Sequence, residues 1–266
     1  MSSLCFGNNC DEFLIVAVVD GCAVIDCFTT LFEKQEDIDF DRRERMGRLI
    51  VFEGLDGSGK STQMERLQAH FTKCDRPFQQ IKLPDYDDPS STLVRMYLNG
   101  DFGGRPSDVN AYAASSFYAV DRYASYRRHW QSAYEAGILI LADRYTTSNA
   151  VHQASKLDAS EWDVYLDWLY DYEFRLLQIP KPDLVLYFDM LPAVSQKLLS
   201  ARYQRDDTRK DIHERDVAYL QRCREAALYA ARRLGWIVIR CDDGVDPKPI
   251  DVIFEQVLQH IRVLEQ

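Results

Sequence analysis

The sequence predicts an α/β protein of the doubly wound, three-layer kind. Short apolar runs recur along the chain with longer stretches of helical spacing between them, and they cover residues 49–52, 78–83, 138–141, 184–188 and 236–239. The runs are continuous rather than alternating, which is typical of parallel strands covered on both faces. A glycine-rich turn follows the first run directly, at the sheet edge where such folds bind their ligands.

Three stretches between the apolar runs show the spacing of amphipathic helices. They cover residues 61–74, 107–136 and 214–234. Gly137 and Gly235 come directly after the second and the third stretch, where a glycine commonly ends a helix. The alternation of strands and helices therefore continues to the end of the chain.

Charge and composition divide the chain in two. The whole sequence has 266 residues, 46% of them hydrophobic, and a net charge of −10, which argues against a nucleic-acid-binding surface. Residues 1–47 hold 4 Lys and Arg against 10 Asp and Glu, and four of the seven cysteines. We take 1–47 as an N-terminal extension without assigned chemistry and 48–266 as one domain. Met46-Gly47-Arg48 looks like a natural start, so the extension is either an appendage or a mis-set start.

The extension carries neither a membrane signal nor a metal signature. Its apolar patch, residues 13–32, follows Asp11 and Glu12 and is interrupted by Asp20 and Asp26, which argues against a spanning helix or a secretory signal. Its cysteines have a longer spacing than zinc knuckles use and no histidine nearby, so we expect reduced thiols; they are Cys5, Cys10, Cys22 and Cys27. The sparse cysteines elsewhere fit a reducing compartment, and we expect a cytoplasmic protein.

The glycine-rich turn matches the phosphate-binding motif G-x-x-x-x-G-K-[ST], with a strand before it and a helix after it. Glycines let the backbone N–H groups point inward at an anion, and the start of the following helix adds partial positive charge. Lys60 would reach the β- and γ-phosphates, and Ser61 would offer its hydroxyl to Mg²⁺. The motif predicts an ATP site at Gly54, Leu55, Asp56, Gly57, Ser58, Gly59, Lys60, Ser61 and Thr62.

Asp143 and Arg144 directly follow the third apolar run. That position places them at the carboxyl edge of the sheet, beside the phosphate motif. An acid there can hold Mg²⁺ through water, and an arginine can hold a second phosphate in bidentate fashion. The plain alternative is a surface ion pair at the end of a strand.

Two further sequence clusters each allow two interpretations. The aromatic residues of Phe117-Tyr118-Ala119-Val120-Asp121-Arg122 lie within a predicted helix, where they either pack in the core or form a platform for a base. Residues 201–210 are polar and basic, which fits either a solvated loop or a lid that closes over phosphates.

Taken together and in this order, the motifs resemble the thymidylate kinase family. The resemblance rests on G-L-D-G-S-G-K-S-T, F-Y-A-V-D-R, D-R-Y-T-T-S-N-A-V-H-Q and, after the basic segment, K-D-I-H-E, and it runs from about Arg48 to the end of the chain. It implies a P-loop NTPase fold with a five-stranded parallel sheet and a short basic lid. It also implies transfer of the γ-phosphoryl group of ATP to dTMP, giving dTDP for dTTP synthesis, with Mg²⁺ and in a homodimer.

The resemblance also implies roles for single residues. Asp56 would bond the 3′-hydroxyl of the sugar, and Arg144 would hold the acceptor phosphate. Asp143 would organise the metal together with Ser61. The thymine pocket would contain Tyr118 stacked on the base, Arg122 beside it, and Asn149 and Gln153 along its wall.

The sequence departs from the family pattern at several positions. Many members carry an arginine shortly after a Phe-Pro pair, whereas here Leu83-Pro84 is followed by Asp85-Tyr86, with Arg95 as a possible substitute. His152 stands where a tyrosine is common.

Some members place an arginine in the phosphate loop, at the position held here by Gly57, and others supply it from the lid. We therefore expect Arg205 and Arg209 to provide the positive charge for the transition state. Two rival functions remain: a kinase for another nucleotide or for a deoxynucleoside, and a nucleotide-binding module that switches conformation without transferring phosphate.

Overall fold

The computed structural model describes residues 46–202 and 217–264, the side chains of 200–202 and 217 excepted. Residues 1–45, 203–216 and 265–266 lie outside this part of the chain, and with them the cysteines of the extension and Arg205 and Arg209 of the expected lid. The compact unit that contains the predicted motifs is Gly47–Gln266. Among the described residues, no helix is both long enough and apolar enough to cross a membrane.

Five parallel strands form one sheet in the order β2-β3-β1-β4-β5. Their bounds are β1 Leu49–Glu53, β2 Phe78–Lys82, β3 Leu139–Asp143, β4 Leu184–Asp189 and β5 Ile237–Arg240. In register, Phe52 of β1 lies beside Asp143 of β3 on one side and Leu186 of β4 on the other. The predicted parallel sheet is confirmed, and the central position of β1 places the glycine-rich turn at the middle of the carboxyl edge.

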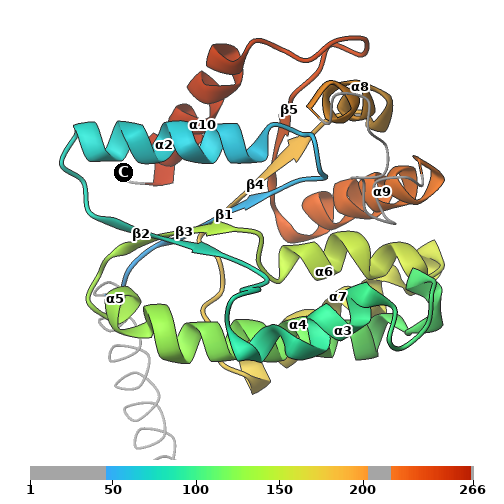
Figure 1. Cartoon of the computed structure of the whole chain (residues 1–266). Helices are drawn as coiled ribbons and strands as arrows, with labels where there is room; N and C mark the ends of the chain where they lie inside the picture. Colours follow the sequence, from blue (N-terminus) through green and yellow to red (C-terminus); the bar gives the residue numbers. More distant parts are fainter. Residues whose placement is uncertain (1–45, 203–216, 265–266) are drawn as a thin grey trace, which may run out of the picture. The chain divides into compact units, whose positions relative to one another are not determined.

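Helices cover both faces of the sheet (Figure 1). One face packs against α2 Lys60–Lys73 and α10 Ile250–Leu264, and the other lies toward α3 Thr92–Asn99, α4 Ala111–Ser125, α6 Thr147–His152, α7 Trp162–Tyr170 and α9 Val217–Leu234. The remaining helices are α5 Gln131–Glu135 and α8 Pro192–Arg202. This arrangement confirms the three-layer α/β prediction.

Side-chain alternation along β1 separates the core from the site. Ile50 and Phe52 are buried in the large apolar cluster formed with α2 and α10, where Phe52 stacks on Phe188 of β4 at 5.3 Å. Glu53 is also fully buried, but its carboxylate accepts hydrogen bonds from residues of the opposite layer. β1 therefore ends with the buried carboxylate of Glu53, beneath the carboxyl edge of the sheet.

Two details of the prediction need correction. Only the three central strands are buried along nearly all of their length, because β2 and β5 form the edges of the sheet. The stretch 107–136 is also not one helix: Asn110 caps α4 by accepting a hydrogen bond from the N–H of Ala113 at 2.8 Å, and a π-helical turn, Tyr126–Trp130, separates α4 from α5. Gly137 and Gly235 do follow helices, with positive φ angles of 83° and 74°.

Candidate active site

The glycine-rich turn forms a pocket between β1 and the start of α2. The pocket is lined by residues 55–62 together with Leu198 and Leu199 of α8. Gly57 and Gly59 have φ angles of +80° and +84°, which side-chain-bearing residues rarely adopt. Gly54 lies behind the turn, where a Cβ atom would approach the Ser58 Oγ to 2.7 Å and the Phe188 carbonyl oxygen to 2.9 Å. Eight of the nine residues predicted to bind ATP thus line the pocket, and the ninth allows the turn to pack.

Unpartnered and charged groups mark this turn as a place for an anion. The Oγ of Ser58 is buried and has no hydrogen-bond partner in the described part of the chain. Lys60 extends its Nζ to Oδ1 of Asp143 at the end of β3, and both side chains are almost completely buried. Burial lowers the pKa of Lys60, and the nearby Arg144 lowers it further, whereas Asp143 acts in the opposite direction. The predicted proximity of Lys60 and Asp143 is therefore present as a direct ion pair.

A second pocket, of about 210 Å³, adjoins the first. Its wall includes all six residues expected to contact dTMP: Asp56, Tyr118, Arg122, Arg144, Asn149 and Gln153. Asp56 lines both pockets. The two cavities therefore meet at this carboxylate, one residue beyond Leu55 in the phosphate motif.

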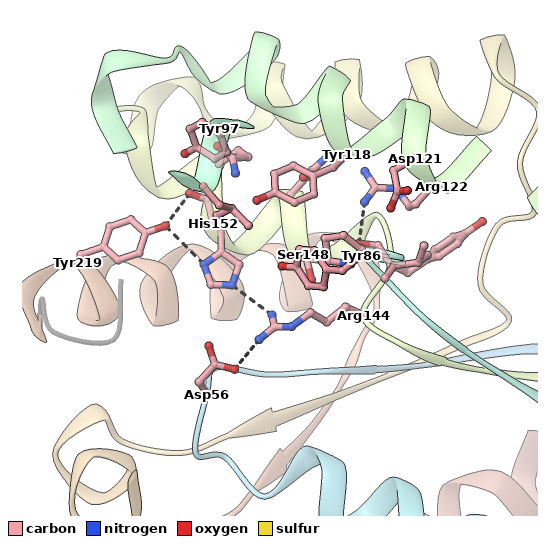
Figure 2. Close-up of a pocket in the computed structure, with 16 residues that line it drawn as sticks. Asp56, Tyr86, Tyr97, Tyr118, Asp121, Arg122, Arg144, Ser148, His152 and Tyr219 are labelled. Carbon is pink, nitrogen blue, oxygen red and sulfur yellow. Dashed lines mark hydrogen bonds and ion pairs between the residues drawn. The ribbon is translucent and has the colours of Figure 1, made fainter. Parts of the chain in front are cut away.

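Arg144 lines the second pocket and lies beside Asp56, which lines both pockets (Figure 2). Its NH2 donates to Oδ1 of Asp56 at 2.8 Å, and its NH1 donates to Oε1 of Glu53 at 3.3 Å. Burial opposes the charged guanidinium, but the carboxylates of Asp56 and Glu53 outweigh it and raise the pKa of Arg144. Burial likewise raises the pKa of Asp56, but Arg144 and the other basic groups around this carboxylate together outweigh burial, so the net shift of its pKa is downward. Both groups are therefore held in their charged forms.

Arg122 forms a buried ion pair with Glu173, a residue that the sequence analysis did not identify. Its Nε and NH2 donate to the two oxygens of Glu173 at 2.6 and 2.5 Å, and both side chains are buried. Glu173 also accepts hydrogen bonds from Oγ1 of Thr146 at 2.7 Å and Nδ2 of Asn149 at 3.4 Å. Arg122 lines the pocket as expected, but most of its donors serve this ion pair, and only NH1 lies toward the Tyr145 carbonyl oxygen, at 3.4 Å.

One part of the wall of the second pocket consists of aromatic rings and side-chain amides. Tyr118 lies against the edge of Tyr97, with 6.4 Å between the ring centroids, and burial raises the pKa of its hydroxyl. Tyr118 therefore both packs against Tyr97 and forms part of the wall of the second pocket. Asn149 donates through Nδ2 to the Ser115 carbonyl oxygen at 3.2 Å, which fixes its amide. The Oε1 of Gln153 is buried and has no partner among the described residues, so it presents an unused acceptor.

Arg95 does not take the place of the missing loop arginine. Its NH1 donates to the Tyr86 carbonyl oxygen at 2.5 Å and to Oγ of Ser91 at 3.1 Å, and it does not line either pocket. Tyr86 itself, 46% exposed, lies at the pocket wall together with Leu83 and Pro84, which are joined by a cis peptide bond. The loop after β2 therefore contributes an aromatic ring and backbone to this pocket rather than a cation.

Several pocket residues were not expected from the sequence, among them Tyr86, Tyr97, Tyr219 and Asp121. Asp121 accepts from the hydroxyl of Ser90 and from the backbone N–H of Asp85, at 2.6 and 3.0 Å, and so ties the loop after β2 to α4. Only the adjacency of Asp121 to Arg122 in the aromatic cluster could have drawn attention to it.

Comparisons with known proteins agree with this geometry. The family model for thymidylate kinase matches residues 52–246. A thymidylate kinase of Mycobacterium tuberculosis is 33% identical over 210 residues, which cover 75% of this chain and 93% of that protein. A thymidylate kinase of Caenorhabditis elegans is 27% identical over 212 residues, covering 76% and 87%.

A solved structure of thymidylate kinase from Candida albicans has the same fold, with a TM-score of 0.61 and 22% identity over 83% of this chain and 93% of that one. The matched segment includes every residue that lines either pocket, and the fold brings the sequence motifs together there. On this evidence, the chain belongs to the thymidylate kinase family.

Proposed function

We propose that the two pockets divide the reaction of a thymidylate kinase between them, with ATP on the glycine-rich turn and dTMP in the pocket beside it. The γ-phosphoryl group of ATP passes to the phosphate of dTMP, giving ADP and dTDP. The observation that carries this proposal is the position of Asp56, which lines both pockets and pairs with Arg144. Two phosphates bound on either side of this pair would face each other.

On the donor side, the turn supplies fixed dipoles and one mobile charge. Its backbone N–H groups and the start of α2 would surround the phosphates, and the unpartnered hydroxyl of Ser58 would add a donor. Lys60 would exchange Asp143 for the β- and γ-phosphates, since a flexible ammonium group can swing between two anions. Charge compensation in the transition state is the main task of such a lysine.

The residues at this edge also fit Mg²⁺. The hydroxyl of Ser61 at the start of α2 and the carboxylate of Asp143 are oxygen ligands of the kind that this ion prefers. Ser61 and Asp143 would hold the ion there, and its charge would offset the negative charge that develops on the donor phosphates. Asp143 would be free for this role once Lys60 turns to the nucleotide.

On the acceptor side, the chemistry needs no strong base. The second pKa of a phosphate monoester is about 6, so dTMP is largely a dianion near neutral pH. Its oxygen can attack directly if the repulsion between the two phosphates is offset and water is excluded. Arg144, held charged by Asp56 and Glu53, is placed for the first task. Asp56 would also accept a hydrogen bond from the 3′-hydroxyl of the sugar.

The base would lie deeper in the pocket, against Tyr118. Thymine offers a donor at N3–H, and the unused acceptor of Gln153 is suited to it. Cytosine has an acceptor at N3, so it would leave two acceptors facing each other. Arg122, fixed by Glu173, and Asn149 would flank the remaining edge of the base.

The last positive charge for the transition state is assigned to Arg205 and Arg209, which lie outside the described residues. Gly57 supports this assignment because its φ of +80° and a Cβ contact of 3.0 Å with Leu199 and with the Ser195 carbonyl oxygen disfavour any side chain there. An arginine introduced at position 57 would thus be strained. The protein would need its arginine from another segment, and residues 201–210 are the strongly basic one.

We also propose a homodimer in the cytoplasm, with no nucleic-acid partner, and an N-terminal extension, residues 1–47, that takes no part in the chemistry. The net charge of −10 supports the absence of a nucleic-acid surface.

A coupled assay of the full chain with ATP, Mg²⁺ and one acceptor at a time tests the proposed function. The acceptors are dTMP, dUMP, UMP, CMP and thymidine. We expect dTDP formation with dTMP to exceed the rates with UMP, CMP and thymidine by at least tenfold, roughly the discrimination given by one unpaired buried polar group. ATP binding without dTDP formation would support the switch module instead, and a preference for another acceptor would redirect the assignment of the second pocket.

A further inference from the structure

Arg144 is fixed at one corner and leaves other donors unused. A guanidinium group has five N–H bonds. The NH1 group donates to Oε1 of Glu53 and to Nε2 of His152, each at 3.3 Å, and NH2 donates to Oδ1 of Asp56. Within the described part of the chain, Nε–H and the second hydrogen of NH2 have no protein acceptor. In Arg122 and in Arg224, the Nε and NH2 groups together donate hydrogen bonds to a carboxylate. The corresponding Nε–NH2 edge of Arg144 is therefore suited to an anion.

The contact with Arg144 fixes the protonation of His152. An arginine side chain can only donate hydrogen bonds, so Nε2 of His152 has to be an unprotonated acceptor. The ring proton then lies on Nδ1, which faces α9: the hydroxyl of Tyr219 is 3.5 Å away and Sγ of Cys223 is 3.7 Å away. The rings of His152 and Tyr219 are stacked, with 6.4 Å between their centroids. Figure 2 shows the resulting chain from Asp56 through Arg144 and His152 to Tyr219.

We propose that His152 is a positioning residue for Arg144: its neutral imidazole holds the NH1 corner, so that the free edge of the guanidinium meets the phosphate of dTMP, and protonation of His152 releases that corner. The proposal rests on the proposed function, in which Arg144 holds the acceptor phosphate. It adds a residue that acts through Arg144 and makes the acceptor site sensitive to pH.

The surroundings of His152 carry charge of both signs. Carboxylates favour its protonated form, whereas a neighbouring cation favours the neutral form. Among the described residues, Asp56 of the glycine-rich turn interacts with it electrostatically, Arg144 at the end of β3 contacts its Nε2, and Tyr219 and Cys223 of α9 lie at its Nδ1. Glu53 of β1 and Lys60 of α2 act on it through their interactions with Arg144 and Asp56. A protonated ring would direct an N–H at the N–H of a permanent cation 3.3 Å away, so the contact would be lost. Acid therefore weakens the hold on Arg144.

Three variants separate the two nitrogens of the ring. In His152→Gln, the amide oxygen reaches about as far as Nε2, so it can accept from Arg144 but does not titrate. In His152→Asn, the amide ends near the position of Nδ1 and cannot reach Arg144. His260→Gln on α10, which lines neither pocket, serves as the matched control for exchanging a histidine.

Steady-state kinetics at pH 8 gives the first readout. We expect His152→Asn to raise the KM for dTMP about tenfold, which corresponds to loss of a hydrogen bond to a charged group, with little change in the KM for ATP. His152→Gln should stay within about threefold of the wild type, as the rescue by an acceptor requires. Equal KM values for dTMP in wild type and His152→Asn would overturn the proposal.

The pH profile gives the second readout, and it does not depend on whether His152→Asn folds. The ratio of kcat/KM for dTMP between wild type and His152→Gln is measured from about pH 8 to about pH 5.5, across the range in which histidines titrate. Protonation of dTMP itself affects both enzymes equally and cancels in the ratio. We expect the ratio to fall at least about threefold toward acid, since only the wild type loses its acceptor. A flat or rising ratio contradicts the proposal.

Arg144→Ala distinguishes this inference from the function on which it rests. If Arg144→Ala raises the KM for dTMP while the His152 variants behave like the wild type, the positioning proposal alone is wrong. If Arg144→Ala leaves the KM for dTMP unchanged, the acceptor site itself is misassigned and both proposals are overturned.

Discussion

Replacing Glu173 with glutamine tests how the base pocket is held together. The carboxylate of Glu173 is fully buried and accepts from two nitrogens of Arg122, from Thr146 and from Asn149. Glutamine keeps the size but removes the charge and turns one acceptor oxygen into an NH₂ group, which would face donors. Arg122 would then be a buried cation without a counter-ion.

Removing one partner of a buried ion pair costs about 3–5 kcal/mol. A domain of 150–250 residues loses roughly 2–4 °C of Tm per kcal/mol, so we expect Glu173→Gln to lower the Tm by roughly 6–20 °C. Urea denaturation at constant m-value measures the free energy of unfolding directly. Because Arg122 and Asn149 both line the pocket proposed for dTMP, the KM for dTMP should rise more than the KM for ATP.

The double variant Arg122→Met, Glu173→Leu controls for the physical cause. Because the double variant removes both charges, its loss of unfolding free energy should be smaller than the summed losses of the single variants Arg122→Met and Glu173→Leu. A cost below about 1 kcal/mol for Glu173→Gln, or a double variant that is at least as unstable as that sum, would refute the reasoning that an uncompensated buried charge is responsible.

Four other perturbations have defined outcomes. Lys60→Met should bind dTMP nearly normally and lose at least about 90% of kcat, because the proposed function places its charge opposite the transferred group; a smaller loss contradicts that role. Asp56→Ala should raise the KM for dTMP at least roughly tenfold and less for ATP, and the effect should shrink with an acceptor that lacks the 3′-hydroxyl. Arg205→Ala and Arg209→Ala, singly or together, should lower kcat by at least about a hundredfold with little change in the KM for dTMP; near-wild-type rates would remove the lid arginines from the mechanism. Burial lowers the pKa of Lys156 to about 8, so the unfolded chain binds more protons above that pH, and stability should rise as the pH increases from about 8. Lys156→Met should flatten that rise in urea denaturation.

The order of elements and the phosphate turn could be predicted because their signals are local. The phosphate turn has its glycines, a lysine and a hydroxyl within nine residues, between an apolar run and a helical stretch. Few backbone conformations are compatible with this combination. The proximity of Lys60 and Asp143 followed from topology, since the turn that leads to Lys60 follows β1, and Asp143 ends β3, which pairs directly with β1.

Partners that depend on tertiary packing could not be predicted from the sequence. Glu173 lies 51 residues from Arg122, in a π-helical segment, Asp171–Leu176, where glutamate in a helical pattern is normally exposed. The contact of His152 with Arg144 depends on α6 turning back over the end of β3, and its contact with Tyr219 on how α9 packs against α6. The break between α4 and α5 was missed for a similar reason: Tyr126 and Gln131, at its two ends, keep helical dihedral angles and only Trp130 is shown to depart from them, so the sequence spacing shows no interruption.

The most direct test of the central claim is competition by a bisubstrate compound in which adenosine and thymidine are joined by a polyphosphate chain. If the two pockets meet at Asp56 and Arg144, one molecule can occupy both, because its phosphates pass from the turn to the free edge of Arg144. We predict inhibition that is competitive against ATP and also against dTMP, with much tighter binding than either substrate alone, and loss of that advantage in Arg144→Ala. Competition against only one substrate, with ordinary affinity, would contradict the claim that the two pockets form one phosphoryl-transfer site.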